Sequence, residues 1–142
     1  MAGFRMPDAS HVGRRYTARG HVVDAERARA MARAIVGSDE PFEPDAVPPT
    51  FAAVYCLGPT FAQLFTDEEV GINLAGLIHG EQVFEWPERV RPGDTVDAVA
   101  EIAGVEEKRG MTFVTLAVEA TRPADGATVC RGRALMIVRG AA

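Results

Sequence analysis

The stretch PPTFAAVYCLGPTFAQLF, from Pro48 to Phe65, is the most informative part of this sequence. Its residues are apolar on nearly every side, which is typical of a helix that is buried all round rather than one that lies on a surface. Gly58-Pro59 interrupts it. Because proline lacks the backbone donor and clashes with the preceding turn, we expect a kink or a break there. The rest of the chain must supply the cover for this helix.

The residues after this helix are typical of antiparallel strands. The segment GLIHGEQVFEW at residues 76–86 leads to the turn Arg91 to Asp94, where Pro and Gly at the central positions suit a type II turn. Separated by the turn sequences EEKRG and RPADG, apolar residues then alternate within residues 95–103, 114–120 and 129–138. Alternation of this kind with tight turns between the segments predicts an antiparallel sheet.

The residues before the buried helix predict one strand and one shorter helix. Residues 16–23 have strand character, and Asp24 is a suitable N-cap for the helical segment AERARAMARAIVG, which Gly37 ends. The apolar side of this helix is formed by Ala28, Met31, Ala32 and Ile35. A sheet wrapped around a buried helix is the hot-dog architecture. We therefore expect an α+β fold, with a single hot-dog domain over residues 1–142.

The composition excludes several classes of function. The chain has 142 residues and a net charge of −5, so one globular domain is expected and a nucleic-acid surface is not. No apolar stretch could span a bilayer, and the N-terminus lacks the apolar core of a secretory signal. Cys56 and Cys130 are expected to be buried reduced thiols, which favours a cytoplasmic protein. No metal-ligand cluster and no glycine-rich phosphate loop occurs, so we expect neither a metal nor another cofactor.

Several segments together carry a resemblance to a known family. The sequence resembles the MaoC-like hydratase/dehydratase family, and above all its N-terminal-type, non-catalytic half and the small subunits of (3R)-hydroxyacyl-ACP dehydratases. The order of the segments is more specific than any one of them. In addition to the paired final strands, these segments are HVGRRY at residues 11–16, GSDEPFEPD at 37–45, PPTF at 48–51 and HGEQVFEWPERVRPGDTV at 79–96.

The resemblance implies that the catalytic loop is degenerate. Catalytic members of the family carry G-D-x-N-P-[I/L/V]-H-x-D, in which the Asp and His activate the water that adds to an enoyl thioester, with amide donors for the enolate oxygen. Gly37, Pro41 and Asp45 keep the frame of this motif. Ser38, however, stands at the position of the catalytic Asp, and Glu43 stands at that of the catalytic His.

Two groups remain as candidate catalytic residues, Glu43 and His79. A carboxylate in a partly apolar cleft can have its pKa raised toward neutrality, which would let Glu43 act as a base. His79 and Glu81 share parity at the start of a strand, so we expect their side chains on one face. Backbone amides at the start of the buried helix would donate to a thioester carbonyl. The candidate substrate-binding residues are Thr50, Phe51, Tyr55, His79, Glu81 and Trp86.

The function implied by the resemblance is that of one subunit of an enoyl-thioester hydratase or 3-hydroxyacyl-thioester dehydratase that acts on acyl-CoA or acyl-ACP. A catalytic MaoC-like hot-dog partner would supply the Asp/His pair. Two alternatives stay open, because one fold serves several chemistries. One is a homodimeric hot dog that binds an acyl or polyketide-like ligand without hydrating it, and the other is a thioesterase-like hot dog. Stoichiometry tests the first alternative, and thioester cleavage with a Glu43→Ala control tests the second.

Overall fold

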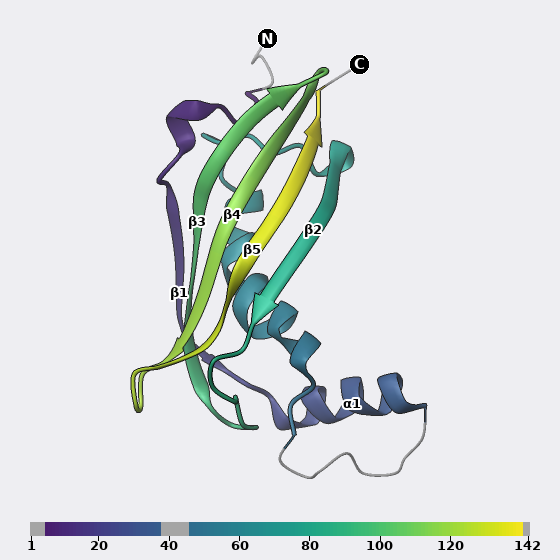
Figure 1. Ribbon diagram of the computed structural model, residues 1–142, viewed down its shortest axis with the longest axis vertical. Helices are drawn as coiled ribbons and strands as arrows, with labels where there is room; N and C mark the ends of the chain where they lie inside the picture. Colours follow the sequence, from purple (N-terminus) through teal and green to yellow (C-terminus); the bar gives the residue numbers. More distant parts are fainter. Residues whose placement is uncertain (1–4, 38–45, 141–142) are drawn as a thin grey trace.

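The computed structural model describes residues 5–37 and 46–140, in which a five-stranded antiparallel sheet curves around one helix (Figure 1). The strand order is β1-β3-β4-β5-β2, so the strands at the two edges both precede the central meander in sequence. The predicted α+β hot-dog arrangement is therefore confirmed. The strands are β1 (Arg15–Val22), β2 (Leu77–Glu85), β3 (Thr95–Lys108), β4 (Met111–Arg122) and β5 (Ala127–Arg139).

The central helix has three parts: η2 (Pro49–Phe51), η3 (Ala53–Leu57), which is a turn of π-helix, and α2 (Gly58–Phe65). At Gly58-Pro59, where the sequence predicts a kink or a break, the helix instead changes from π-helical to α-helical winding, with Leu57 and Gly58 both in the right-handed helical region and Pro59 in the first turn of α2. The amide of Gly58 donates to the carbonyl of Ala53, five residues back. The wider turn therefore leads into the proline, whose missing donor is tolerated at the start of a helix.

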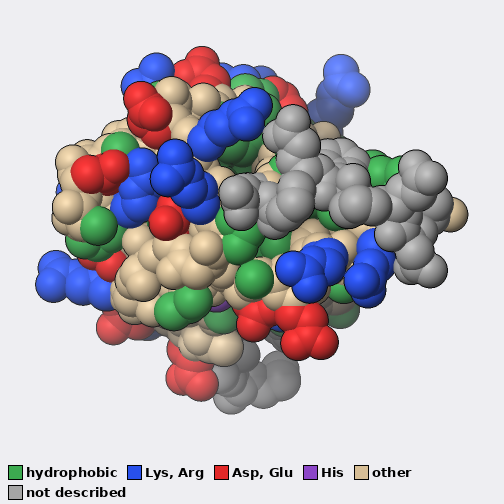
Figure 2. Space-filling view, turned by 90° about the horizontal axis from the view of Figure 1, so that it is seen from below, with side chains coloured by type: hydrophobic (Ala, Val, Ile, Leu, Met, Phe, Trp, Pro, Cys, Tyr) green, Lys and Arg blue, Asp and Glu red, His purple; other side chains and the backbone are tan. Residues whose placement is uncertain are grey.

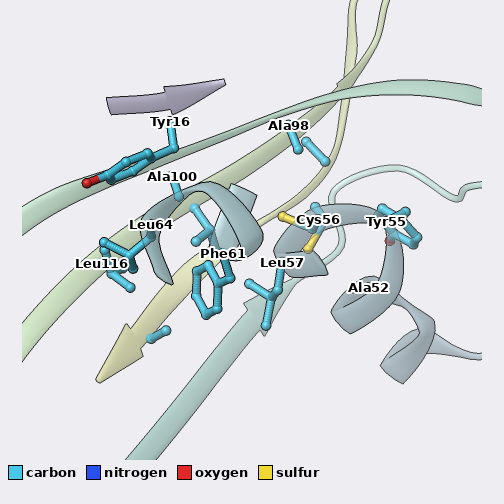
Figure 3. Close-up of a cluster of buried hydrophobic side chains, with 14 of the residues drawn as sticks. Tyr16, Ala52, Tyr55, Cys56, Leu57, Phe61, Leu64, Ala98, Ala100 and Leu116 are labelled. Atoms are coloured by element: carbon cyan, nitrogen blue, oxygen red, sulfur yellow. The ribbon is translucent and has the colours of Figure 1, made fainter. Parts of the chain in front are cut away.

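The sheet covers only one side of the central helix. On that side Phe61 and Leu64 pack against Ala100 and Leu116 of the sheet (Figure 3). The hydroxyl of Thr60, which is also buried, donates to the carbonyls of its own helix. The other side carries the small or polar residues Ala53, Gly58, Ala62 and Gln63, all of them exposed. The expectation that this chain buries the helix all round is therefore wrong for the described residues, since five strands curve past one face only.

The shorter helix, α1 (Ala25–Val36), begins and ends as the sequence predicts. A carboxylate oxygen of Asp24 accepts from the amide of Arg27 at 2.8 Å, and Gly37 ends the helix with a φ of 73°. Its apolar stripe is only partly buried, because Ile35 at the far end is 59% exposed. Figure 1 shows why: α1 projects away from the lower end of the sheet, so its last turn has no layer to pack against.

A polar cluster fastens β1 to the segment that follows α2. The carboxylate of Asp67 accepts two hydrogen bonds from Arg14, at 2.6 and 3.1 Å, and one from the hydroxyl of Tyr16 at 2.7 Å. Burial alone would raise the pKa of Asp67, but these bonds and the amide of Glu69 outweigh it and hold the pKa below its ordinary value. Contacts within the fold therefore hold Asp67 in its charged form.

Candidate functional site

A β-bulge at Gly80 determines which side chains β2 turns toward the central helix. His79 pairs with Met136, whose side chain is buried on the inner face of the sheet, whereas Glu81 pairs with Leu135 on the outer face. The prediction that His79 and Glu81 share a face is therefore wrong. One extra residue in a strand moves every later side chain of that strand to the opposite face of the sheet from the one that simple alternation predicts.

The inner row of β2 comprises the side chains that face the central helix: Leu77, His79, Gln82 and Phe84. The imidazole of His79 lies over the C-terminal half of that helix, with its ring centre 6.3 Å from that of Phe61. Its Nε2 is 3.1 Å from Oε1 of Gln82. His79 is nevertheless exposed, because β2 is the edge strand.

Gln82 is the residue of this site that sequence reasoning missed. Counting from His79 by strict alternation places Gln82 on the opposite face from the histidine, whereas the bulge brings both to the inner row. A glycine inside a strand is a signal for a bulge. Gly80 was thus the available clue, and a Cβ there would lie 2.9 Å from Cδ1 of Ile137.

Glu81 belongs to a separate, outer surface. Its carboxylate pairs with Arg133 at 3.1 Å, and Glu85, further along the outer face of β2, pairs with Arg131 at 2.9 Å. Arg133, Glu85 and Arg131 line a shallow depression of about 540 Å³ on the side of the sheet that faces away from the helix. This depression is separated from the inner row by the thickness of the sheet, and its charged lining does not suit an acyl chain.

The aromatic residues divide into a buried group and an open group. Tyr55 and Phe51 are buried in the core with their ring centres 6.4 Å apart, and burial raises the pKa of Tyr55, which keeps its phenol neutral. Trp86, directly after β2, is 44% exposed and lies 5.8 Å from the half-buried ring of Phe84. Of the three aromatic residues predicted to bind the substrate, Phe51, Tyr55 and Trp86, only Trp86 is therefore accessible.

The backbone amides at the start of the central helix largely donate their hydrogen bonds within the chain. The amide of Phe51 donates to the carbonyl of Pro48 at 2.8 Å, so it is not free for a thioester carbonyl. Thr50 is exposed, and its hydroxyl lies 3.8 Å from the sulfur of Met31. The degenerate motif positions Ser38 and Glu43 lie outside the described residues, and their roles stay predictions.

The two cysteines lie together in the core rather than in a reactive site. Cys56 and Cys130 are both free and fully buried, as the sequence predicts. A hydrogen bond with Cys130, together with burial, raises the pKa of Cys56. A buried, protonated thiol is a poor nucleophile.

Among residues 5–37 and 46–140, no three His, Cys, Asp or Glu side chains gather as the ligands of a metal ion would. No helix within these residues has the length and apolarity needed to cross a bilayer.

An antiparallel sheet that curves around one helix is the hot-dog fold. The comparison with protein families adds the class, since residues 10–131 match the family described as "FAS1-like, dehydratase domain region". The chain belongs to this family.

Similar sequences are found among actinobacterial proteins named UPF0336. The one from Cutibacterium acnes is 35% identical over 113 residues, which cover 77% of this chain and 78% of that protein. The one from Saccharopolyspora erythraea is 26% identical over 147 residues, covering 95% and 93%. The likeness therefore extends over most of each chain.

Similar solved structures share the fold at low sequence identity. The HadBC (3R-hydroxyacyl-ACP dehydratase) complex from Mycobacterium tuberculosis contains a chain with a TM-score of 0.72 and 22% identity, covering 89% of this chain and 96% of that one. A MaoC-like dehydratase from Rhodospirillum rubrum has a TM-score of 0.56 and 19% identity, covering 92% and 94%. These similarities establish the hot-dog fold.

Proposed function

We propose that this chain is the non-catalytic hot-dog subunit of a heteromeric enoyl-thioester hydratase or 3-hydroxyacyl-thioester dehydratase. It forms part of the acyl pocket, and a second hot-dog subunit supplies the Asp and His that activate water. One observation carries this proposal: a member of a dehydratase family has Ser38 and Glu43 at the two positions where the catalytic loop needs Asp and His.

The inner row of β2 supports a role in holding the acyl group. Leu77 and Phe84 supply apolar surface beside the central helix, and Trp86 extends this surface beyond the end of the strand. Ligand sites for apolar groups combine such surface with a few polar groups that fix orientation, which here are His79 and Gln82. Tyr55 and Phe51 act behind this wall as its packed support.

The free edge of β2 supports a partner subunit. β2 is the last strand of the described sheet, so the backbone groups along its outer edge have no strand partner in residues 5–37 and 46–140. Ile78 and Val83 on this strand are 42% and 40% exposed. A partner hot dog that extends the sheet would cover this edge.

Arg89 and Arg91, beyond Trp86, are suitable for the anionic end of an acyl carrier. They line a cleft of about 1040 Å³ at the lower end of the molecule, and neither makes an ion pair with a described residue. Seen from that end, acidic side chains lie between the basic ones, so the face is not uniformly positive (Figure 2). Arg131 and Arg133, in contrast, are neutralised by Glu85 and Glu81.

Charge reversal of these two arginines tests the carrier assignment. We expect Arg89→Glu with Arg91→Glu to raise KM for acyl-CoA or acyl-ACP about tenfold in the assembled enzyme, with little change in kcat. Arg139→Glu, near the C-terminal end of β5, is the matched control because it lies outside the cleft lining. Equal KM values for the cleft variant and the control would contradict this carrier site.

The subunit proposal is tested by assaying enoyl-thioester hydration with this chain alone and mixed with a hot-dog chain that carries an intact G-D-x-N-P-x-H loop. We expect activity from the mixture and none from this chain alone. Full activity of the isolated chain would overturn the proposal. If Glu43→Ala abolished the activity of the complex, Glu43 rather than the partner would hold the base. A stable homodimer that ignores the partner would favour acyl binding without hydration.

A further inference from the structure

The side-chain amide of Gln82 is fixed in one orientation. Its Nε2 lies 3.2 Å from the carbonyl of Val83 and 3.2 Å from the carbonyl of Arg133. An amide nitrogen carries two hydrogens and can donate to both carbonyls, whereas the amide oxygen has no hydrogen to donate. The opposite orientation would place three oxygens in contact with no proton between them. The geometry therefore leaves Oε1 of Gln82 to face His79.

This orientation selects one tautomer of His79. Oε1 of Gln82 can only accept, so the ring nitrogen 3.1 Å away, Nε2, must carry the hydrogen. In a neutral imidazole the other nitrogen, Nδ1, then presents a lone pair. No described residue donates a hydrogen bond to Nδ1, and the His79 side chain is exposed. Gln82 is thus a positioning residue that turns His79 into an oriented acceptor.

The position of His79 indicates which part of a thioester would meet this acceptor. His79 lies beside the apolar ring of Phe61 in α2, whereas Arg89 and Arg91 lie beyond the opposite end of β2. Strands rise about 3.3 Å per residue, so Trp86 and His79 are separated by about 20 Å. A carrier held at the arginines would therefore bring the acyl part, rather than the carrier, toward His79. An acyl part of the 3-hydroxyacyl type has its hydroxyl as a hydrogen-bond donor.

We propose that His79 is a substrate-binding residue whose Nδ1 accepts a hydrogen bond from the hydroxyl of a 3-hydroxyacyl thioester. Gln82 fixes the tautomer that makes this contact possible. The inference rests on the proposed function. Pairing of a partner along β2 uses the backbone of the strand, so the inner row stays available to the ligand. The contact favours the hydroxyacyl form over a saturated acyl group of the same length, because a bound saturated group would displace water from Nδ1 without replacing its hydrogen bond.

The tautomer is tested by NMR with ¹⁵N-labelled histidine in alkaline buffer, in which imidazoles are neutral. We expect the His79 spectrum to show a protonated Nε2 and an unprotonated Nδ1. In Gln82→Leu, which removes the acceptor, a mixture of the two tautomers is expected. The chain has three histidines, and a His79→Phe sample assigns the signal. A His79 that is protonated at Nδ1 would overturn the inference, as would a tautomer population that is the same in Gln82→Leu.

The contact itself is tested with two probes, 3-hydroxybutyryl-CoA and butyryl-CoA, whose affinities for the assembled complex are measured by calorimetry. His79→Phe is expected to lower the preference for the hydroxylated probe about tenfold, whereas His21→Phe in β1 leaves it unchanged. An unchanged preference in His79→Phe would overturn this inference alone. Failure of the wild-type complex to bind either probe would overturn both this inference and the proposed function.

Discussion

At the scale of single residues, Asp67 illustrates how a charge can serve the fold rather than the chemistry. Asp67→Asn removes the charge that Arg14 and Tyr16 bind, so we expect the free energy of unfolding to fall by about 1–3 kcal/mol at pH 7. The folded pKa of Asp67 lies below its ordinary value of 3.8. The stabilisation is therefore complete above that value and is lost as the pH falls through the folded pKa. Urea unfolding of both proteins between pH 7 and pH 2 measures this.

The difference in the free energy of unfolding between wild type and Asp67→Asn should thus become smaller in acid. Glu69→Gln is the control, because Glu69 pairs with the same Arg14 at 2.9 Å but its side chain is 70% exposed. We expect a change of about 0–1 kcal/mol from this control at every pH. A gap between wild type and Asp67→Asn that stays constant down to pH 2 would show that the carboxylate contributes by packing rather than by charge.

At the scale of secondary-structure elements, Gly132 allows β2 to join the sheet. A Cβ at Gly132 would lie 1.8 Å from the carbonyl oxygen of Val83, which is too close for any side chain. We expect Gly132→Ala to force β2 away from β5 and to cost about 3 kcal/mol or more. Gly104→Ala in β3 is the matched control, since its Cβ would meet only Thr115 at 3.9 Å. Hydrogen exchange of the β2 amides measures the local effect.

A protected β2 in Gly132→Ala would contradict the assignment of this glycine to strand pairing. Loss of protection in β3 and β4 as well would show that β2 unfolds together with the whole sheet rather than alone.

The elements that could be predicted from sequence are those specified by local residues. The change of winding at Gly58-Pro59 follows from proline geometry, and the turn closed by the amide of Asp94 on the carbonyl of Arg91 follows from its Pro-Gly pair. Gly80 signals a bulge in β2, but local residues do not fix how the bulge changes the pairing of the strand. That change depends on how β2 aligns with β5, a partner about fifty residues further along the chain. The inner row and the role of Gln82 depend on the same alignment.

At the scale of the whole molecule, the free edge of β2 is where we expect association. Val83→Lys introduces a charge at this edge, and we expect it to weaken binding of the partner subunit, or of a second copy, at least tenfold without unfolding the chain. Val22→Lys on β1, which forms the opposite edge, is the control. Light scattering and titration calorimetry measure the association. Equal effects of the two lysines would argue against β2 as the specific edge.

The open side of the central helix also belongs to this scale. The pattern of apolar residues along a helix indicates which side chains avoid water, but it does not show what covers them. Ala53, Gly58 and Ala62 therefore predicted burial and proved exposed in the single chain. What covers this side cannot be derived from local pattern, because local pattern does not report long-range contacts.

The π-helical turn at Ala53–Leu57 has a consequence for how this sequence can vary among descendants. Such a turn holds one residue more than the α-helix it replaces. Because the wider turn takes up the extra residue, removing one residue there would restore ordinary α-helical winding and leave Phe61 and Leu64 facing the core. The same deletion within α2 would rotate the residues after it by about 100° and turn Leu64 out of the core. One-residue deletions should therefore be tolerated in this turn and be rare in α2.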